Sequence, residues 1–423
     1  MKVIAKPARA YTNVLKMRLN RALKRNVARN YPISAFIDPA QFCQLRCPAC
    51  AVGLRSDLRS ATALNLDLYK AVMEEIGDYL FFLDLYNWGE PLLHKQLPEM
   101  IAFANQKNIH VTISTNLSVQ LSDDYLSRLV KSGLDRMTVS LDGASQETYE
   151  RYRRGGNFSL VVQNMQKIQK IKRELGLNSP KIYIQFLVFK HNEHEIDNIK
   201  QSYRDLGADS YYFGTPVMTD VAESEKFDIQ PSTFKEYDIF HPDNPLNRRT
   251  KEASSRPCSW LYSTLVIDSS GNLSPCCAVA SESDSFAALS VGDNVMEAWN
   301  NKKFRDARTF TGSRDSKYIS VGDDYKRVPN IEAALVKGPG ELICKYCPQP
   351  WMQRIAFETV EQICAHLSDM VLNNKSITMK LKAVFYYFLM GVPLNIRMIR
   401  KFLTALNSRF RPIIYTETRE KSL

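Results

Sequence analysis

The sequence predicts an α/β protein in which six parallel strands alternate with helices as an open, partial barrel. Two patterns support this class. Short apolar segments alternate with segments of helical periodicity between residues 33 and 215, and a loop with three cysteines follows the first apolar segment. Strands that alternate with helices form parallel βαβ units with right-handed crossovers. Six strands are fewer than the eight of a closed barrel, and active sites in such folds lie at the carboxyl ends of the strands.

Each element follows from its own pattern. The expected strands are short and apolar, and they span 33–37, 79–86, 110–114, 136–141, 182–190 and 211–214. The expected helices have apolar residues at helical spacing, and they span 66–76, 97–105, 123–131, 160–175 and 195–206. The chain therefore divides into an N-terminal segment 1–30, a partial barrel 31–215, a linker 216–257, a cysteine-bearing domain 258–350 and a basic helical extension 351–423. The 12-residue apolar run at 383–394 is too short for a bilayer span of about 20 residues.

Positive charge gathers at the two ends of the chain. The net charge is +11, residues 1–30 carry nine basic side chains and no acidic one, and residues 370–423 carry ten basic and two acidic. The middle of the chain is therefore mildly acidic, which argues against a nucleic-acid groove and an RNA-modifying enzyme. The basic ends favour peripheral contact with a membrane surface or another polyanion.

The N-terminal segment predicts a basic amphipathic helix. Tyr11, Leu15, Leu19, Ala22 and Leu23 fall on one helical face. Such a helix either lies on an anionic bilayer or packs on the protein body with its cations in water, and a transit peptide is disfavoured by the scarcity of serine. An odd count of nine cysteines without a secretory signal predicts reduced, metal-bound thiols in the cytoplasm, with peripheral placement at the inner membrane face left open.

The cysteines after the first strand are the most specific feature. Cys43, Cys47 and Cys50 have the spacing C-x3-C-x2-C. A [4Fe–4S] cluster normally takes four thiolates, so three leave one iron open to a small molecule. A structural zinc ion needs four closed ligands, and the nearest histidine, His94, is 44 residues away. The alternatives are three buried thiols or a zinc site completed from elsewhere in the chain.

Four further segments, each after an expected strand, give the chain a resemblance to the radical S-adenosylmethionine (radical SAM) superfamily over about residues 33–350. They are Trp88-Gly89-Glu90-Pro91, which resembles a Gly-Gly-Glu motif with Trp88 in place of the first glycine, Ser114-Thr115-Asn116, Ser140-Leu141-Asp142-Gly143, and Asn192-x2-Glu195. The resemblance implies that the cysteine triad holds a [4Fe–4S] cluster. Its open iron would bind SAM, which one electron would cleave to a 5′-deoxyadenosyl radical.

The resemblance also implies SAM-binding residues. They are Gly89, Glu90, Ser114, Asn116, Ser140, Asp142 and one arginine among Arg151, Arg153 and Arg154, of which we choose Arg153. Glu90 suits the ammonium group of SAM, and an arginine suits its carboxylate because the two can pair in a bidentate geometry.

The second cysteine set resembles the auxiliary-cluster domain called SPASM, or its shorter form, twitch. The expected ligands of one auxiliary [4Fe–4S] cluster are Cys258, Cys276, Cys344 and Cys347, and the later cysteines of a full SPASM pattern do not follow. A four-cysteine zinc site is the alternative. Cys277 and Cys364 are expected to be small buried side chains.

A fully ligated auxiliary cluster suits electron transfer, because it cannot bind substrate without losing a thiolate. Similar twitch enzymes oxidise alcohols, so we expect a radical SAM oxidoreductase that dehydrogenates a sugar, an aminocyclitol or a lipid-linked glycan precursor. Its electron donor would be a flavodoxin or ferredoxin. Epimerisation with Cys277 as hydrogen donor stays open, and so does peptide modification, although 42 residues before Cys43 are few for a leader-binding domain. A non-catalytic Fe–S carrier or scaffold would need neither Glu90 nor residues 140–143.

Overall fold

The computed structural model describes residues 6–48, 50–54, 58–216, 226–238, 241, 257–313 and 344. These residues all belong to one compact unit, Lys2–Thr359. The predicted helical extension 351–423, Cys347 and Cys364 lie outside the described residues.

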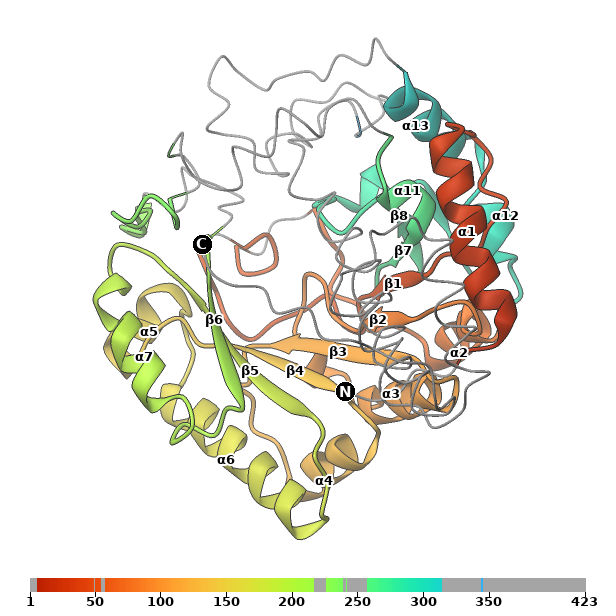
Figure 1. Cartoon of the computed structure of the whole chain (residues 1–423). Helices are drawn as coiled ribbons and strands as arrows, with labels where there is room; N and C mark the ends of the chain where they lie inside the picture. The colour runs from red at the N-terminus through yellow and green to blue at the C-terminus, as the bar shows by residue number, and fades with distance from the viewer. Residues whose placement is uncertain are drawn as a thin grey trace, which may run out of the picture. The chain divides into compact units, whose positions relative to one another are not determined.

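One sheet runs through the described residues, with the strand order β6-β5-β4-β3-β2-β1-β7-β8-β9 (Figure 1). Its first six strands pair in parallel with their sequence neighbours, as the alternating pattern predicts. They are β1 (Ser34–Ile37), β2 (Phe82–Asp84), β3 (His110–Thr115), β4 (Arg136–Ser140), β5 (Lys181–Leu187) and β6 (Ser210–Gly214). The predicted α/β class and the six parallel strands are therefore confirmed.

Helices cover the outer face of these strands (Figure 1). They are α2 (Leu66–Ile76), α3 (Leu97–Gln106), α4 (Asp123–Lys131), α5 (Gln146–Tyr152), α6 (Phe158–Glu174) and α7 (Ile196–Ser202). Every second strand residue faces them, so that Leu83, Val111 and Ile184 are 0% exposed while their neighbours on the inner face are partly accessible. Polar side chains cap the helices, since Asn65 accepts from the N–H groups of Asp67 and Leu68 at the start of α2.

A hairpin from the cysteine-bearing domain extends the sheet beyond β1. Strand β7 (Thr264–Ile267) pairs in parallel with β1, and β8 (Asn272–Ser274) and β9 (Ala287–Ala288) follow in antiparallel order. Gly271, at φ +86°, forms the turn between β7 and β8. The helices α11 (Trp260–Ser263), α12 (Val295–Ala298) and α13 (Lys302–Gly312) complete the described part of this domain. The sequence pattern did not predict that the two cysteine-bearing regions share one sheet.

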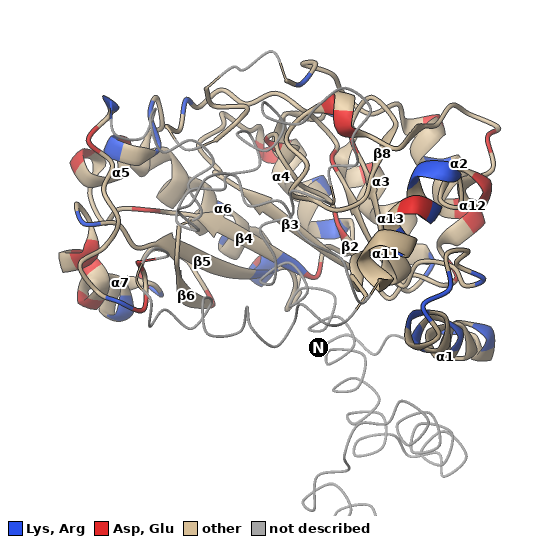
Figure 2. Ribbon diagram, turned by 90° about the horizontal axis from the view of Figure 1, so that it is seen from above, with Lys and Arg blue, Asp and Glu red and all other residues tan. Residues whose placement is uncertain are grey.

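The N-terminal helix α1 (Ala8–Ala22) packs on the protein body. Tyr11 meets Phe81 edge to face, and the guanidinium of Arg21 donates to the Pro257 carbonyl. The buried side includes Asn13 and Asn20, whereas Leu19 and Leu23 are 53% and 55% exposed. The structure thus agrees with the alternative in which this helix packs on the protein body. The predicted apolar face is wrong for the C-terminal half of the helix, where Leu19 and Leu23 are exposed. Lys and Arg residues are frequent along α1, as the blue colouring in Figure 2 shows.

Among the residues that the structure describes, no helix is both long and apolar enough to cross a bilayer.

Candidate active site

The cysteine triad lies in the loop that follows β1. Cys47 is buried with Tyr152 and Phe189, and the half-buried Cys43 and Cys50 pack against the same cluster. Burial raises the pKa of Cys43 to about 12 and that of Cys47 to about 11. Burial disfavours the charged thiolate form, and a positive metal centre would favour it.

Hydrogen-bond donors point at two of the three sulfur atoms. The Asn116 side-chain amide lies 3.5 Å from the Cys43 Sγ, and the Leu45 N–H lies 3.4 Å from the same sulfur. Nη1 of Arg153 lies 3.8 Å from the Cys47 Sγ. Donors to sulfur are among the levers that set the potential of an iron–sulfur cluster. The loop is therefore suited to a cluster bound through Cys43, Cys47 and Cys50.

Within the described ranges, no three His, Cys, Asp or Glu side chains are gathered as ligands of a single metal ion. A [4Fe–4S] cluster binds each thiolate at a different iron, so its ligands need not converge on one point. The described cysteines also form no disulfide bond with one another.

Glu90 is held beside the triad by the turn after β2. Its carboxylate is 2% exposed and accepts from Thr115 Oγ1 at 2.6 Å, from the Asn116 N–H at 2.8 Å and from the Leu92 N–H at 3.0 Å. The Leu92 contact caps the short helix η1 (Pro91–Leu93). Burial raises the pKa of Glu90 to about 7, and these hydrogen bonds oppose the rise. Because each carboxylate oxygen has two acceptor positions, Glu90 can still accept from an ammonium group.

Gly89 allows Glu90 to reach this place. A Cβ atom at Gly89 would lie 1.6 Å from the Ala40 carbonyl oxygen. The Glu90 N–H also donates to the Phe42 carbonyl at 3.0 Å, directly before the first cysteine. The Glu90 turn and the cysteine loop are therefore in backbone contact, which explains why the motif needs a glycine here.

The structure pairs Asp142 with Arg153. Nε of Arg153 donates to Asp142 Oδ2 at 2.5 Å, and the Leu187 N–H donates to the other carboxylate oxygen at 2.7 Å. Burial lowers the pKa of Arg153, but Asp142 and the nearby Cys47 outweigh it and hold that pKa well above its ordinary value. Of the three candidate arginines, Arg151 instead pairs with the exposed Asp228 and Arg154 lies over the Phe227 ring. Within the described part of the chain, Arg153 is the one of the three whose guanidinium contacts a triad sulfur, which keeps it the preferred candidate.

The remaining predicted SAM residues lie at the ends of β3 and β4. Asn116 accepts from Gln44 at 2.8 Å, Ser140 is buried, and Ser114 is half-buried on the inner face of the sheet. The Asn192 amide donates to the Asp142 carbonyl at 3.0 Å, and Glu195 accepts from the Ala144 N–H at 2.9 Å. Asn192 and Glu195 thus support the segment after β4. The predicted contacts of Ser114, Asn116 and Ser140 with SAM stay predictions.

Three of the auxiliary cysteines surround one apolar cluster. Cys258, Cys276 and Cys277 pack against Phe36 and Trp260, beside the paired strands β1 and β7. Burial raises the pKa of Cys258 and raises that of Cys277 to about 12, with Asp84 adding to the second shift. Cys344 is half-buried, and its ligand role stays a prediction along with those of Cys258, Cys276 and Cys347.

Sequence reasoning missed a polar group on the inner face of the sheet. It comprises Asp84, Arg136, Tyr183 and Tyr212. Asp84 and Tyr183 alternate along their strands with buried apolar residues, a period-2 signal that was present in the sequence. The Arg136 guanidinium lies 4.1 Å from the Tyr183 ring centroid and 5.7 Å from that of Tyr212. Its buried Nε has no hydrogen-bond partner in the described part of the chain.

A partial parallel barrel with a cysteine loop directly after its first strand is an α/β fold that is suited to hold an iron–sulfur cluster. Residues 37–202 match the model of the Radical SAM superfamily, and residues 258–321 match that of SPASM, an iron–sulfur cluster-binding domain. The chain therefore belongs to the radical SAM superfamily and carries a SPASM-type auxiliary-cluster domain. Its cofactors are SAM, the [4Fe–4S] cluster that binds it, and an auxiliary cluster.

Curated relatives match part of the chain. The "PqqA peptide cyclase" of Granulibacter bethesdensis is 24% identical over 42% of this chain and 45% of its own length. The "Fe-coproporphyrin III synthase" of Methanosarcina barkeri is 28% identical over 37% of each chain. The chain thus spans less than half the length of these relatives.

Two solved structures are partly similar to this chain. Streptococcus suis SuiB bound to S-adenosylmethionine has 14% identity and a TM-score of 0.48, with 78% of this chain and 75% of that chain covered. BtrN in complex with AdoMet and 2-DOIA has 14% identity and a TM-score of 0.42, with 77% and 96% covered. No functional conclusion follows from either likeness.

Proposed function

We propose that this radical SAM enzyme dehydrogenates a hydroxyl group on a sugar, an aminocyclitol or a lipid-linked glycan precursor. The observation that carries the proposal is the position of Asp84. It lies on the inner face of β2, between Leu83 and Leu85, which are buried on the other face. It is also close enough to Cys277 to raise the pKa of that thiol. A proton acceptor on the inner face of the barrel, near an auxiliary-domain cysteine, suits an alcohol oxidation.

Oxidation of an alcohol to a carbonyl removes a carbon-bound hydrogen atom, a hydroxyl proton and one further electron. The bound cofactors supply the adenosyl radical that takes the hydrogen atom and an iron–sulfur acceptor for the electron. The proton is left for the protein. Burial raises the pKa of Asp84 to about 7, while Arg136 and a hydrogen bond from Tyr86 lower it. A carboxylate with that pKa accepts a proton and releases it again near neutral pH.

The polar inner face supports a hydroxyl-rich substrate. The exposed donors of a guanidinium bind hydroxyl oxygens, and tyrosine rings pack against the C–H faces of a sugar ring. Arg136, Tyr183 and Tyr212 supply both kinds of surface on adjacent strands. We also propose a flavodoxin- or ferredoxin-type donor, since the superfamily needs a reductant.

Epimerisation is the second candidate function, and the position of Cys277 favours it. This thiol packs with Phe36 and Tyr86, which face the inner side of the sheet. A thiol there could return a hydrogen atom to the opposite face of a substrate radical. Peptide modification, as the name of the PqqA peptide cyclase suggests for that relative, is tested by the same assay with peptide substrates.

The test uses the anaerobically reconstituted full chain with SAM, dithionite and a panel of carbon-deuterated sugars and aminocyclitols. The proposal predicts deuterium in 5′-deoxyadenosine together with a carbonyl product. The Asp84→Asn variant should still form 5′-deoxyadenosine but should lose most carbonyl product, whereas Asp205→Asn, at an exposed position, should match the wild type. An inverted alcohol in place of the carbonyl would identify an epimerase, and failure to cleave SAM would identify a non-catalytic Fe–S protein.

A further inference from the structure

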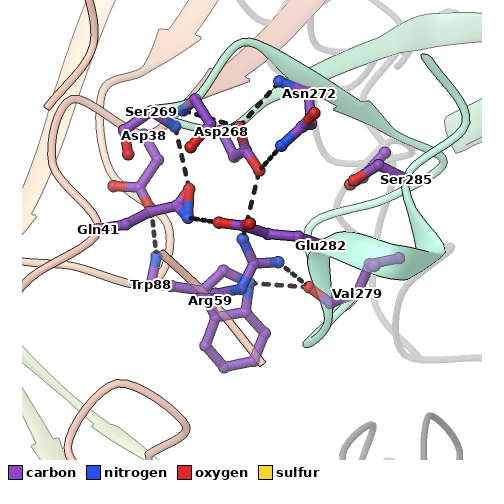
Figure 3. A network of polar contacts seen from close by, with 12 residues as sticks. Asp38, Gln41, Arg59, Trp88, Asp268, Ser269, Asn272, Val279, Glu282 and Ser285 are labelled. Carbon is purple, nitrogen blue, oxygen red and sulfur yellow. Dashed lines mark hydrogen bonds and ion pairs between the residues drawn. The ribbon is translucent and has the colours of Figure 1, made fainter. Parts of the chain in front are cut away.

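Trp88, which stands where the resembling motif has a glycine, reaches from the Glu90 turn to the auxiliary-cysteine loop. Its indole Nε1 donates to the Val279 carbonyl at 3.0 Å (Figure 3). Val279 follows Cys276 and Cys277, and its own N–H lies 3.5 Å from the Cys276 carbonyl. A glycine at position 88 would have no side chain to make this contact. The substitution therefore links the predicted SAM-binding turn to the predicted auxiliary ligands.

The backbone of the Trp88 turn is held from the other side. Oδ2 of Asp38, at the end of β1, accepts from the Trp88 N–H at 2.9 Å and from the Gly89 N–H at 3.4 Å. Together with the close approach of Gly89 to Ala40, these bonds hold the backbone of the turn against the segment that follows β1. The Trp88 side chain thus joins the turn that holds Glu90 directly to the Val279 carbonyl.

Arg59 provides a second donor to the same carbonyl. Its guanidinium lies 5.3 Å from the Trp88 ring, donates to the Val279 oxygen through Nη2, and approaches Asp268 of the auxiliary domain at 3.8 Å (Figure 3). The side chain is 4% exposed, and its Nε and Nη1 have no hydrogen-bond partner among the described residues. A buried arginine that is only partly hydrogen-bonded carries a desolvation cost. Arg59 offsets this cost by joining the Trp88 ring to the Val279 carbonyl and to Asp268.

Three loops meet at this point. Ala51, directly after the triad, and Ala280, directly after Val279, form one small buried cluster against which Trp88 packs. Beside it, Gln41 donates to the Glu282 carboxylate at 2.9 Å and accepts from the Ser269 N–H at 3.1 Å (Figure 3). The triad loop, the Glu90 turn and the auxiliary loop therefore share one set of contacts.

We infer that Trp88 and Arg59 are positioning residues that couple SAM binding to the auxiliary cluster. An ion pair between SAM and Glu90 shifts the position of the turn, in which Trp88 lies two residues before Glu90. The shift changes the hydrogen bond from the indole to the Val279 carbonyl, and with it the position of the loop that carries Cys276. Hydrogen bonding and exposure set the potential of an iron–sulfur cluster. SAM binding therefore shifts the potential of the auxiliary cluster, and by linkage the redox state of that cluster changes the affinity for SAM by the same factor.

One neutral hydrogen bond limits the size of the coupling to about tenfold in affinity. For a one-electron couple a tenfold change corresponds to about 59 mV. The experiment is an EPR-monitored redox titration of the reconstituted full chain, with and without SAM and without substrate. The test variant is Trp88→Phe, which keeps an aromatic ring and removes the N–H. The matched control is Tyr69→Phe, which removes one buried hydrogen bond to a backbone carbonyl, that of Met100 at 2.8 Å, far from both cysteine sets.

The expected result is a SAM-dependent shift of the auxiliary signal in the wild type and in Tyr69→Phe, and its loss in Trp88→Phe with the iron content unchanged. If Trp88→Phe loses iron, the same titration is run on Arg59→Lys, where loss of the shift supports the inference. A wild type without a shift, or a shift that survives in the variant that holds both clusters, overturns it. The inference rests on the proposed function in one respect only: the protein must hold both iron–sulfur clusters. It does not depend on the dehydrogenation of a substrate. Absence of carbonyl product with the shift intact would therefore count against the dehydrogenation alone.

Discussion

Gly89→Ala is predicted to weaken SAM binding. The added Cβ would lie 1.6 Å from the Ala40 oxygen and 2.6 Å from its carbonyl carbon, where real contacts do not fall below 3.0 Å. The turn must therefore move by at least about 1.4 Å, against backbone that cannot rotate away. A shift of that size lengthens the 3.0 Å bond from the Glu90 N–H to the Phe42 carbonyl beyond hydrogen-bonding range. Glu90 would then lose its place beside the triad.

The predicted loss is that of a charge-assisted contact to the SAM ammonium group, about 1.5–3 kcal/mol, or about 10- to 150-fold in affinity. Anaerobic calorimetric titration with SAM measures it, with iron content and thermal unfolding as checks on folding. Gly312→Ala is the matched control, because Gly312, like Gly89, has no positive φ, and its added Cβ would meet only the Lys24 side chain, at an ordinary contact distance of 3.4 Å. Wild-type affinity in Gly89→Ala, at full iron content, would refute the reasoning.

Three further predictions concern charge. Because the pKa of Glu90 is raised to about 7, its carboxylate is protonated at lower pH, and SAM affinity should fall by about tenfold per pH unit below that value. In Glu90→Gln the affinity should be weak and independent of pH, and a wild-type slope in that variant would be contrary evidence. Arg153→Lys should weaken SAM binding about tenfold, since a lysine cannot keep two directed contacts, whereas Arg151→Lys should not. Arg308→Met should cost about 3–5 kcal/mol in urea unfolding, because the 0% exposed Arg308 bonds three backbone carbonyls; the exposed Arg305→Met should cost little.

The six parallel strands could be predicted because buried parallel strands are continuous apolar segments bounded by helices of clear periodicity. The helix α5 could not, because its seven residues are set by a capping box at Ser145 and not by an apolar stripe. The strands β7 and β8 were missed for a different reason. Their pairing with β1 is a contact between residues more than 200 positions apart, which local pattern does not encode.

The N-terminal helix shows a limit of apolar spacing. Asn13 is buried because its amide bonds the Tyr31 backbone, and Asn20 because it bonds Asn30. Hydrogen bonds thus bury the side of α1 that carries Asn13 and Asn20, although hydropathy alone predicts that this side is exposed. At the candidate site the order of motifs could be predicted. Three features of the site could be found only from the tertiary structure. They are the Asp142–Arg153 pair, the position of Asp84 on the inner face, and the contact between Trp88 and Val279.

The most direct test of the whole account is the iron content of the reconstituted chain together with its cleavage of SAM. Two [4Fe–4S] clusters predict about eight irons per chain in the wild type and about four when Cys43, Cys47 and Cys50 are all replaced by alanine. Dithionite-dependent 5′-deoxyadenosine should form only with the wild-type triad. About four irons in the wild type, or SAM cleavage that survives the triple replacement, would contradict the assignment of the two cysteine sets.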